Sequence, residues 1–370
     1  MNLQTLLRVV VQEKAADLFL KVGNLPTIRV DGVLRRLTRV GGEETRPVDD
    51  DFARAALEEV LDERDRDRFY RTGEGDAAYE VPGLARFRVN AFRQRGHIGF
   101  VFRYIPFEIP TLEELNLPAR QLKQLCAMQR GLVLITGVAG SGKTTCLAAM
   151  VEHINQTQAK HIITIEDPVE FVYTDKGCVI EQREVGFDTE DFRVALKACV
   201  RQSPDVILIG EMRDRETVEA AINAAETGHL VLSTLHTVNA VQTVERILGF
   251  FPPHLHALIR LQLSLVLQGA LSLRLLKRRD RPGRIPACEL LMSTPTVREL
   301  LEQGKTRQLA TALREGDYYG TMTFAQSLAA LAKAGIISEE DALAAADNRD
   351  ELRLELKGFM RDKHPGIKKT

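Results

Sequence analysis

The sequence is poor in the features that mark several large classes of protein. Its 370 residues include five cysteines, an odd number, and no two of them have the C-x-x-C spacing of a zinc or redox motif. We therefore expect no structural metal site, no disulfide framework, and a reducing compartment, the cytoplasm. The formal net charge is -1 and only 6% of residues are aromatic, so the chain offers neither a basic groove nor many stacking residues, and no nucleic acid partner is expected.

Long hydrophobic runs are also missing. The opening segment lacks the charged start, uninterrupted apolar core and cleavage site of a signal peptide. The most apolar stretch further on, residues 258–276, is interrupted by Arg260, Gln262, Gln268 and Arg274. It is therefore not expected to cross a bilayer as a helix, and we expect no direct membrane insertion.

The composition that remains is that of an ordinary globular protein, with 44% hydrophobic and 27% charged residues. Apolar residues recur at helical spacing from Leu3 to Val10, and residues 85–93 alternate with a period of two, as a half-buried strand does. These patterns predict a small α+β domain over residues 1–105. Three prolines in residues 106–118 then predict a linker.

Beyond the linker the pattern changes. Four short apolar runs, residues 132–135, 162–165, 206–209 and 230–232, interrupted only by Thr164, alternate with helical segments. Strands that are buried on both faces and joined by helices form parallel sheets, so residues 119–295 are predicted to be an α/β domain. Residues 296–370 are predicted to be mostly helical and to end in a frayed tail.

The strongest motif is GVAGSGKT, which matches G-x-x-x-x-G-K-[ST] and stands between an apolar strand and a helical segment. Glycines let successive backbone N–H groups turn toward phosphate oxygens, and the start of the helix adds a partial positive charge. Lys143 is predicted to reach the β and γ phosphates, and the Thr144 hydroxyl to bind Mg²⁺. The predicted phosphate site consists of Gly137, Val138, Ala139, Gly140, Ser141, Gly142, Lys143, Thr144 and Thr145.

Acidic residues at the ends of two apolar runs refine this prediction. Glu166 follows the run 162–165, and Glu211 follows the run 206–209 after one glycine. The carboxyl ends of strands form the ligand crevice of open α/β sheets, so carboxylates there can hold Mg²⁺ and orient an attacking water. No N-K-x-D motif for guanine is present, which favours ATP over GTP. For the neighbouring Asp167 and Glu170, a role in a turn or a helix cap is an equal alternative.

Two histidines flank the run 230–232. His229 precedes it, and His236 follows the extended segment, at a spacing that does not fit an i, i+4 metal pair. A histidine near a γ phosphate can donate a hydrogen bond to it, so both are candidates for that contact. On spacing alone, a structural role at the ends of the strand is an open alternative.

Together, four ordered motifs resemble those of the secretion ATPases and, within them, the PilT/PilU retraction ATPases of type IV pili. They are GVAGSGKTT (137–145), ITIEDPVEF (163–171), an atypical Walker B segment DVILIGEMRD (205–214) and TGHLVLSTLHT (227–237). GLARFRVNAF (83–92) resembles part of the family's N-terminal domain. The resemblance implies a PAS-like N-terminal domain, a RecA-like P-loop ATPase domain of the α/β class, and a homohexamer that binds ATP and Mg²⁺.

The resemblance also implies roles for individual residues. Glu211 is the Walker B glutamate and holds Mg²⁺ through water, Glu166 polarises the attacking water, and His229 and His236 sense the γ phosphate. An arginine of an N-terminal domain stabilises the charge of the leaving phosphate. Five arginines fit this role, and Arg88 and Arg103 are the two that we name as catalytic candidates. The alternative is that these arginines are only solvated side chains on an edge strand. The five are Arg86, Arg88, Arg93, Arg95 and Arg103.

The function that the resemblance implies is ATP hydrolysis that drives pilus retraction, in the cytoplasm and peripheral to the inner membrane, with a platform protein of the pilus base as partner. Two departures favour an alternative. Residues 296–303 read TVRELLEQ where the PilT kind has A-I-R-N-L-I-R-E, and Val238 replaces an asparagine after H-T. Residues 177–186 and 322–324 look closer to PilU. The alternative function is therefore a nucleotide-binding accessory subunit that assists a second, PilT-like ATPase.

Overall fold

The computed structural model describes residues 2–30, 32–105 and 108–358. The chain divides into two compact units, Met1–Glu108 and Ile109–Thr370. This division falls within the segment 106–118 that the prolines mark as a linker. Residues 106 and 107 of that segment, and the last part of the expected tail (359–370), lie outside the described residues. The second unit contains both the α/β region 119–295 and the segment that begins at residue 296.

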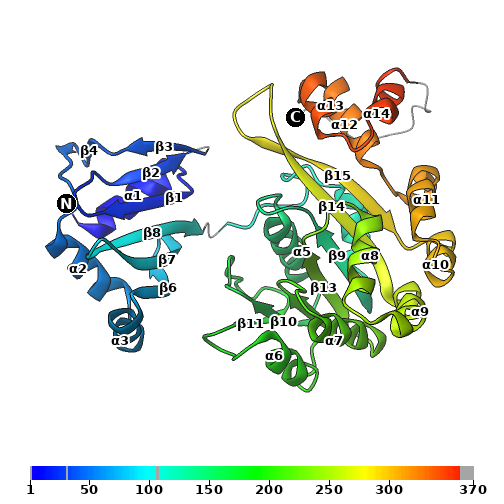
Figure 1. Cartoon of the computed structure of the whole chain (residues 1–370), viewed down its shortest axis with the longest axis horizontal. Helices are drawn as coiled ribbons and strands as arrows, with labels where there is room; N and C mark the ends of the chain where they lie inside the picture. Colours follow the sequence, from blue (N-terminus) through cyan, green and yellow to red (C-terminus); the bar gives the residue numbers. More distant parts are fainter. Residues whose placement is uncertain (1, 31, 106–107, 359–370) are drawn as a thin grey trace. The chain divides into compact units, whose positions relative to one another are not determined.

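The first unit is built on an antiparallel six-stranded sheet of order β3-β2-β1-β8-β7-β6 (Figure 1). Its opening helix forms because Leu3, Leu6, Leu7 and Val10 share one face, and all four are buried. The strands are β1 Asp17–Lys21, β2 Thr27–Val30, β3 Val33–Arg36, β6 Glu74–Val81, β7 Ala85–Gln94 and β8 His97–Ile105, with a separate pair β4 Arg39–Val40 and β5 Glu43–Glu44. The helices are α1 Leu3–Gln12, α2 Asp50–Val60 and α3 Glu63–Thr72.

Strand β7 has the period of two that the sequence predicts. Ala85, Phe87, Val89 and Ala91 are buried, and Arg88 between them is exposed. The strand is not at the edge of the sheet, however, because β6 pairs with it on one side and β8 on the other. The description of this strand as an edge was therefore wrong, and Arg88 projects from the middle of the exposed sheet face.

The second unit is built on a seven-stranded sheet of order β11-β10-β12-β13-β9-β14-β15. Neighbouring strands are parallel from β11 to β14, and β15 returns antiparallel to β14. The strands are β9 Gly131–Thr136, β10 His161–Glu166, β11 Val179–Glu184, β12 Val206–Ile209, β13 Leu230–Leu235, β14 Leu267–Lys277 and β15 Arg284–Met292. The four predicted apolar runs lie in β10, β12, β13 and β9, four consecutive strands of the sheet, and the α/β prediction is confirmed.

Helices cover both faces of this sheet. One apolar cluster joins the sheet to α6, α7, α8 and α9, and a second joins its other face to α4 and α5. The helices are α4 Ala119–Cys126, α5 Lys143–Thr157, α6 Phe192–Cys199, α7 Arg215–Glu226, α8 Ala240–Gly249 and α9 His256–Val266. The doubly covered sheet leaves the carboxyl ends of its parallel strands as the place where β9 meets α5 and β13 meets α8.

The C-terminal part of the second unit is helical, as the sequence predicts. Its helices are α10 Pro295–Glu302, α11 Leu309–Glu315, α12 Phe324–Lys333, α13 Glu339–Ala345 and α14 Arg349–Leu356; short 3-10 turns lie at Pro253–Leu255, Thr306–Gln308 and Asp317–Tyr319. Helices α12, α13 and α14 share an apolar cluster with the β14–β15 hairpin, beside which they lie in Figure 1.

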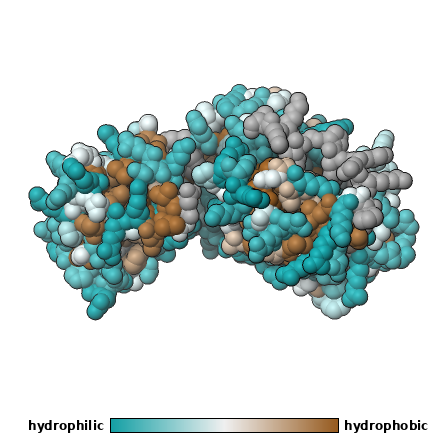
Figure 2. Space-filling model, turned by 90° about the horizontal axis from the view of Figure 1, so that it is seen from above, coloured by the Kyte–Doolittle hydropathy of each residue, from teal (hydrophilic) through white to brown (hydrophobic). Residues whose placement is uncertain are grey.

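The most apolar stretch of the sequence, residues 258–276, is divided between two elements. Its first part belongs to α9, which ends at Val266, and its second part belongs to β14. Among the described residues, no helix combines the length and the apolar character needed to cross a membrane. On the face shown in Figure 2, hydrophilic residues cover most of each unit and hydrophobic residues gather in limited patches.

Candidate active site

The loop between β9 and α5 has a backbone that only glycine allows at several positions. Gly137, Gly140 and Gly142 have φ of 144°, 74° and 94°. At Gly137 a β-carbon would lie 2.4 Å from Ser141 Oγ and 2.6 Å from the Leu273 carbonyl oxygen, so no larger residue fits there. Gly142 caps the start of the 15-residue helix α5, whose first backbone N–H groups have no partners within the helix.

The side chains of this loop suit the phosphates of a nucleotide. Lys143 Nζ donates to the carbonyl oxygens of Gly137 (2.9 Å) and Val138 (3.1 Å). The Ser141 hydroxyl is buried, and among the described residues it has no hydrogen-bond partner. Thr144 in the first turn of α5 is partly buried, in the place where a hydroxyl could ligate Mg²⁺. A cation, an orphan hydroxyl and free N–H groups together fit a bound phosphate.

Three side chains connect this loop with the end of β12. His236 Nδ1 lies 3.4 Å from Lys143 Nζ, and His236 Nε2 lies 3.1 Å from Glu211 Oε1. An ammonium group can only donate a hydrogen bond, so Nδ1 accepts, and the ring proton lies on Nε2, which donates it to Glu211. The side chains of His236 and Glu211 are 49% and 18% exposed, so solvent reaches the contacts between these three residues.

The topology of the sheet explains why these three residues meet. Strand β13 lies between β9 and β12, and its last residue, Leu235, pairs with Thr136 at the end of β9. His236 therefore emerges at the same edge as the loop that carries Lys143. Glu211 emerges there as well, because β12 pairs in parallel with β13 on the other side.

Carboxylates determine the charge around Lys143. Burial lowers the pKa of Lys143, while the nearby Glu211 and Glu170 oppose that shift. Glu170 was one of two residues for which the sequence left a structural role equally open. Its electrostatic effect on Lys143 places it among the acidic groups that influence the candidate site.

A cavity of about 540 Å³ adjoins Glu211 and His236. Arg213 lies on its wall, donating from Nε to Glu211 Oε2 (2.9 Å) and approaching Asp167 Oδ2 with a second nitrogen (3.5 Å). The lining residues are Glu211, Met212, Arg213, Leu235, His236, Thr237, Gln242, Glu245, Arg246 and Gly249. The cavity gives water access to Glu211, the carboxylate that His236 connects with Lys143 of the phosphate loop.

Glu166 ends β10 and is buried in a different environment. Burial raises its pKa to about 7, although hydrogen bonds from Thr164 and Gln182 oppose the shift. Thr164 Oγ1 donates to Glu166 Oε1 over 2.7 Å, and Gln182 Nε2 donates over 3.3 Å. Gln182 belongs to β11, on the side of β10 away from β12. The structure thus holds Glu166 toward β11, and its role in polarising water stays a prediction.

The structure does not bring His229 to this site. His229 precedes Leu230, which pairs with Gly131 at the beginning of β9. Its Nδ1 atom lies 2.9 Å from the Ala224 carbonyl oxygen at the end of α7. His229 therefore lies at the amino ends of the strands, at the opposite edge from the phosphate loop, and we leave it out of the machinery proposed below.

Arg88 and Arg103 belong to the first unit, where they stand directly opposite each other on β7 and β8. Arg103 Nε donates to Asp17 Oδ1 (3.0 Å), and Arg29 Nε approaches the other oxygen of Asp17 (3.2 Å). Asp17 is buried, so it holds both guanidinium groups at the sheet surface. The predicted role of Arg88 or Arg103 at a phosphate stays a prediction.

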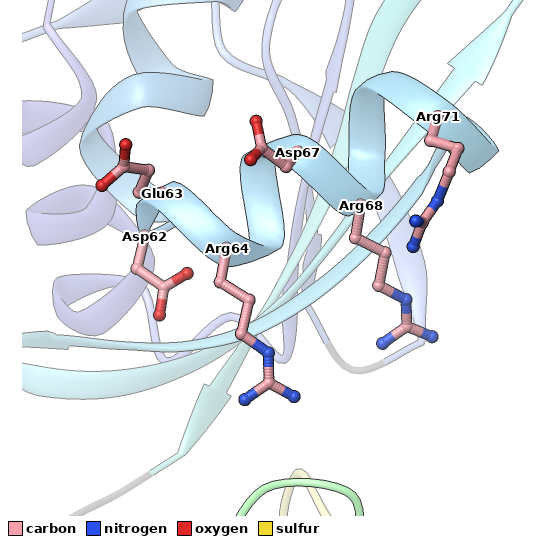
Figure 3. Close-up of a pocket in the computed structure, with 6 residues that line it drawn as sticks. All are labelled: Asp62, Glu63, Arg64, Asp67, Arg68 and Arg71. Atoms are coloured by element: carbon pink, nitrogen blue, oxygen red, sulfur yellow. The ribbon is translucent and has the colours of Figure 1, made fainter.

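A shallow hollow of about 650 Å³ lies on α3 in the first unit (Figure 3). Figure 3 shows Arg64, Arg68 and Arg71 pointing to one side of the helix, and Glu63 and Asp67 to the other. All its lining residues come from α3 and its cap, Asp62. One helix cannot enclose a nucleotide, so this hollow does not compete with the loop at Lys143 as the candidate site.

Comparison with known proteins agrees with this geometry. Residues 100–280 match the family model of the type II/IV secretion system proteins. The chain is 42% identical to the type IV pilus ATPase PilU of Pseudomonas aeruginosa, over 96% of this chain and 92% of that protein. It is also 42% identical to the retraction ATPase PilT of the same organism, over 92% of this chain and 97% of that one. The solved structure of the pilus retraction motor PilT with bound ADP matches with a TM-score of 0.88 and 40% identity, covering 95% of this chain and 99% of that chain.

Proposed function

The chain belongs to the family of type IV pilus ATPases that includes PilT and PilU, and from that premise we propose that it is an ATP-hydrolysing motor that drives pilus retraction and hence twitching motility. The observation that carries this proposal is the contact chain Lys143–His236–Glu211. It connects the loop that suits the phosphates with a carboxylate that water can reach.

Each part of the site has a step in the proposed reaction. The N–H groups of residues 137–142 and the start of α5 bind the phosphates, and Lys143 exchanges its loop carbonyls for phosphate oxygens. The Thr144 hydroxyl and, through water, Glu211 would hold Mg²⁺, which would supply positive charge to offset that of the phosphates. We assign the orientation of the attacking water for an in-line displacement to Glu211 in place of Glu166, because Thr164 and Gln182 hold Glu166 toward β11.

His236 connects binding to hydrolysis. Its Nδ1 atom accepts from Lys143 when that lysine rests on the loop carbonyls. When Lys143 turns to phosphate, Nδ1 loses this donor while Nε2 keeps its contact with Glu211. The orientation of the Glu211 carboxylate then depends on whether phosphate is present, which is how a γ phosphate would be sensed.

The working form that we propose is a homohexamer at the cytoplasmic face of the inner membrane, in contact with a platform protein of the pilus base. The full-length similarity to the retraction motor PilT supports this assembly. An arginine from an N-terminal unit would complete the phosphate site. Both arginines are exposed, and Arg88 is the better candidate because Arg103 is already engaged by Asp17.

A second candidate function is an accessory subunit that binds nucleotide and assists a separate PilT-like ATPase. The chain is as similar to PilU as to PilT, at 42% identity each. The changed segment 296–303 and Val238 point in the same direction.

Phosphate release by the purified chain with Mg-ATP tests the proposal, with Lys143→Ala as the blank. A motor releases phosphate at least about tenfold faster than the blank. Nucleotide binding without turnover above the blank supports the accessory function, and the absence of both binding and turnover contradicts both functions. Retraction in a pilus-bearing strain that lacks its own motor then tests whether turnover does mechanical work.

A further inference from the structure

Arg274 lies on β14 at the level of the phosphate loop. Ser272 pairs with Thr136 at the end of β9, and the Leu273 carbonyl oxygen packs against Gly137. The Arg274 side chain is 19% exposed and stacks on the Phe324 ring, with its central carbon 3.9 Å from the ring centroid. Its guanidinium is thus desolvated and fixed in orientation close to the candidate site.

One side of this guanidinium binds the C-terminal helices. NH1 donates to the Ala345 carbonyl oxygen at the end of α13 over 2.6 Å. NH2 donates to both carboxylate oxygens of Asp347, between α13 and α14, over 2.8 and 2.7 Å. These charge-assisted hydrogen bonds hold Arg274 firmly to the segment that follows α13.

The same NH2 group that binds Asp347 also reaches the loop between β13 and α8. NH2 donates to the Val238 carbonyl oxygen over 3.3 Å, two residues after His236. A second tether comes from β15, where Glu289 accepts from the backbone N–H of Ala240, the first residue of α8, over 2.8 Å. The β14–β15 hairpin therefore holds the loop 237–240 immediately beyond His236.

We propose that Arg274 is a positioning residue for the hydrolytic site, which fixes the loop after His236 to the C-terminal helices so that His236 stays in contact with Glu211. This inference rests on the proposed ATPase function. It assigns the C-terminal helices a part in forming the phosphate site, although they lie outside the four family motifs.

The physical reason is the contact that His236 makes with Glu211. Because Lys143 leaves His236 when it turns to phosphate, the 3.1 Å contact between His236 Nε2 and Glu211 Oε1 is the one that holds the ring at the carboxylate, and a displacement of the loop breaks it. Shifts of about 1 Å in a positioned group cost about a hundredfold in rate. A tether two residues away is therefore close enough to change turnover without touching the nucleotide.

The test compares Arg274→Met with Arg278→Met as a matched control. Arg278 lies further along the same hairpin, is also largely buried, and binds Asp280 through two hydrogen bonds of 2.9 and 2.6 Å. It lies outside the contacts that lead to His236. We expect Arg274→Met to lower kcat about tenfold with KM changed less than about threefold. Arg274→Lys should recover part of the loss, and Arg278→Met should match the parent.

The His236→Ala background separates positioning from general stability. If Arg274 acts through His236, Arg274→Met lowers kcat no further in that background, because coupled residues are not additive. Equal losses with and without His236, or equal losses in Arg274→Met and Arg278→Met, would overturn the proposal. The parent and Lys143→Ala in the same assay report on ATP hydrolysis itself, so the failure of the proposed function is distinguished from the failure of this inference.

Amide hydrogen exchange gives a readout that does not need turnover. Arg274→Met should accelerate exchange of residues 237–240 about tenfold, with Arg278→Met unchanged. Exchange in this loop that is the same in the parent and in Arg274→Met contradicts the tether, whether or not the chain hydrolyses ATP.

Discussion

The two ends of β13 carry the same kind of side chain in different surroundings. His236, after the last residue of the strand, contacts Lys143 and Glu211, whereas His229, before the first residue, contacts a backbone carbonyl at the end of α7. At about 3.3 Å of rise per residue, the two histidines lie roughly 20 Å apart along the strand. Both residues are histidines, so the edge of the sheet at which each one emerges determines which groups it contacts.

The carboxyl edge differs from the amino edge in its backbone. Helices α5 and α8 begin there, and the loops before them contribute N–H groups, glycines and emerging side chains from neighbouring strands. At the amino edge the helices end and present carbonyl oxygens, such as the Ala224 carbonyl that binds His229. An anion is therefore attracted to the first edge and not to the second.

The largest expected effect comes from Glu211, the carboxylate at the active edge. Glu211→Gln keeps the shape of the side chain but removes the charge that orients water, so kcat should fall about 10²- to 10³-fold. Nucleotide binding, measured by calorimetry, should change less than about threefold, because Lys143 and the loop remain. Undiminished turnover would show that a different carboxylate performs this step.

A second carboxylate at the same edge, Glu166, sharpens the comparison because it is buried and its hydrogen bonds come from two neutral side chains, Thr164 and Gln182. Burial raises its pKa from the ordinary 4.5 to about 7, so between these values the folded protein keeps a proton that the unfolded chain releases. The free energy of unfolding therefore falls as pH rises through this window, by about 2–3 kcal/mol for this group alone.

Glu166→Gln removes that dependence, so the variant should gain stability over the parent between pH 5 and pH 8. Denaturant unfolding at the two pH values measures the gain. Glu289, whose pKa burial also raises to about 7, keeps its own contribution in both proteins. A parent and variant with the same pH dependence would mean that Glu166 is ionised throughout.

Substitution of His236 and of His229 tests directly whether the two edges of the sheet differ in function. His236→Ala should lower kcat about 10- to 50-fold, because the Glu211 carboxylate loses the ring that holds its orientation. His229→Ala should change kcat less than about threefold, because its ring contact is to a backbone carbonyl distant from the loop. The two variants control for each other, and equal losses would remove the distinction between the two edges.

The smallest effect concerns the first unit, where the charged cluster is structural. Asp17→Asn leaves Arg29 and Arg103 beside a neutral side chain, and the unit should lose about 1–2 kcal/mol of unfolding free energy. Arg88→Ala, on the same sheet face, should change stability by less than about 0.5 kcal/mol. Thermal unfolding of the full chain measures both; equal changes would mean that Asp17 does not organise the cluster.

The sequence alone predicted the central strands because apolar residues dominate them. Strands β9, β10, β12 and β13 are almost wholly buried, and the few polar residues within them, Thr164, Ser233 and Thr234, do not hide the apolar runs. Strand β11 lies at the edge of the sheet and is half-exposed. Its sequence, VIEQRE, is mostly polar, so no apolar run predicted it. Strand β14 was hidden within an apolar stretch that it shares with α9, because hydrophobicity does not mark where a helix becomes a strand.

The site was predictable where local motifs carry its chemistry. Glu211 and His236 follow the ends of predicted strands, Lys143 begins the helix after another, and parallel topology brings the three together. Arg274 was not predictable, because its partners Val238 and Asp347 are distant in sequence and only the packed hairpin brings them to it. His229 was placed at the same site because spacing along a strand does not say which end faces the ligand.

A crystal structure of Glu211→Gln with Mg-ATP tests the central claim most directly. We expect ATP at the loop 137–142, with Lys143 Nζ moved from the Gly137 and Val138 carbonyls to phosphate oxygens and away from His236, while His229 stays on the Ala224 carbonyl. A nucleotide bound elsewhere, or Lys143 still on its loop carbonyls beside a bound nucleotide, would contradict it.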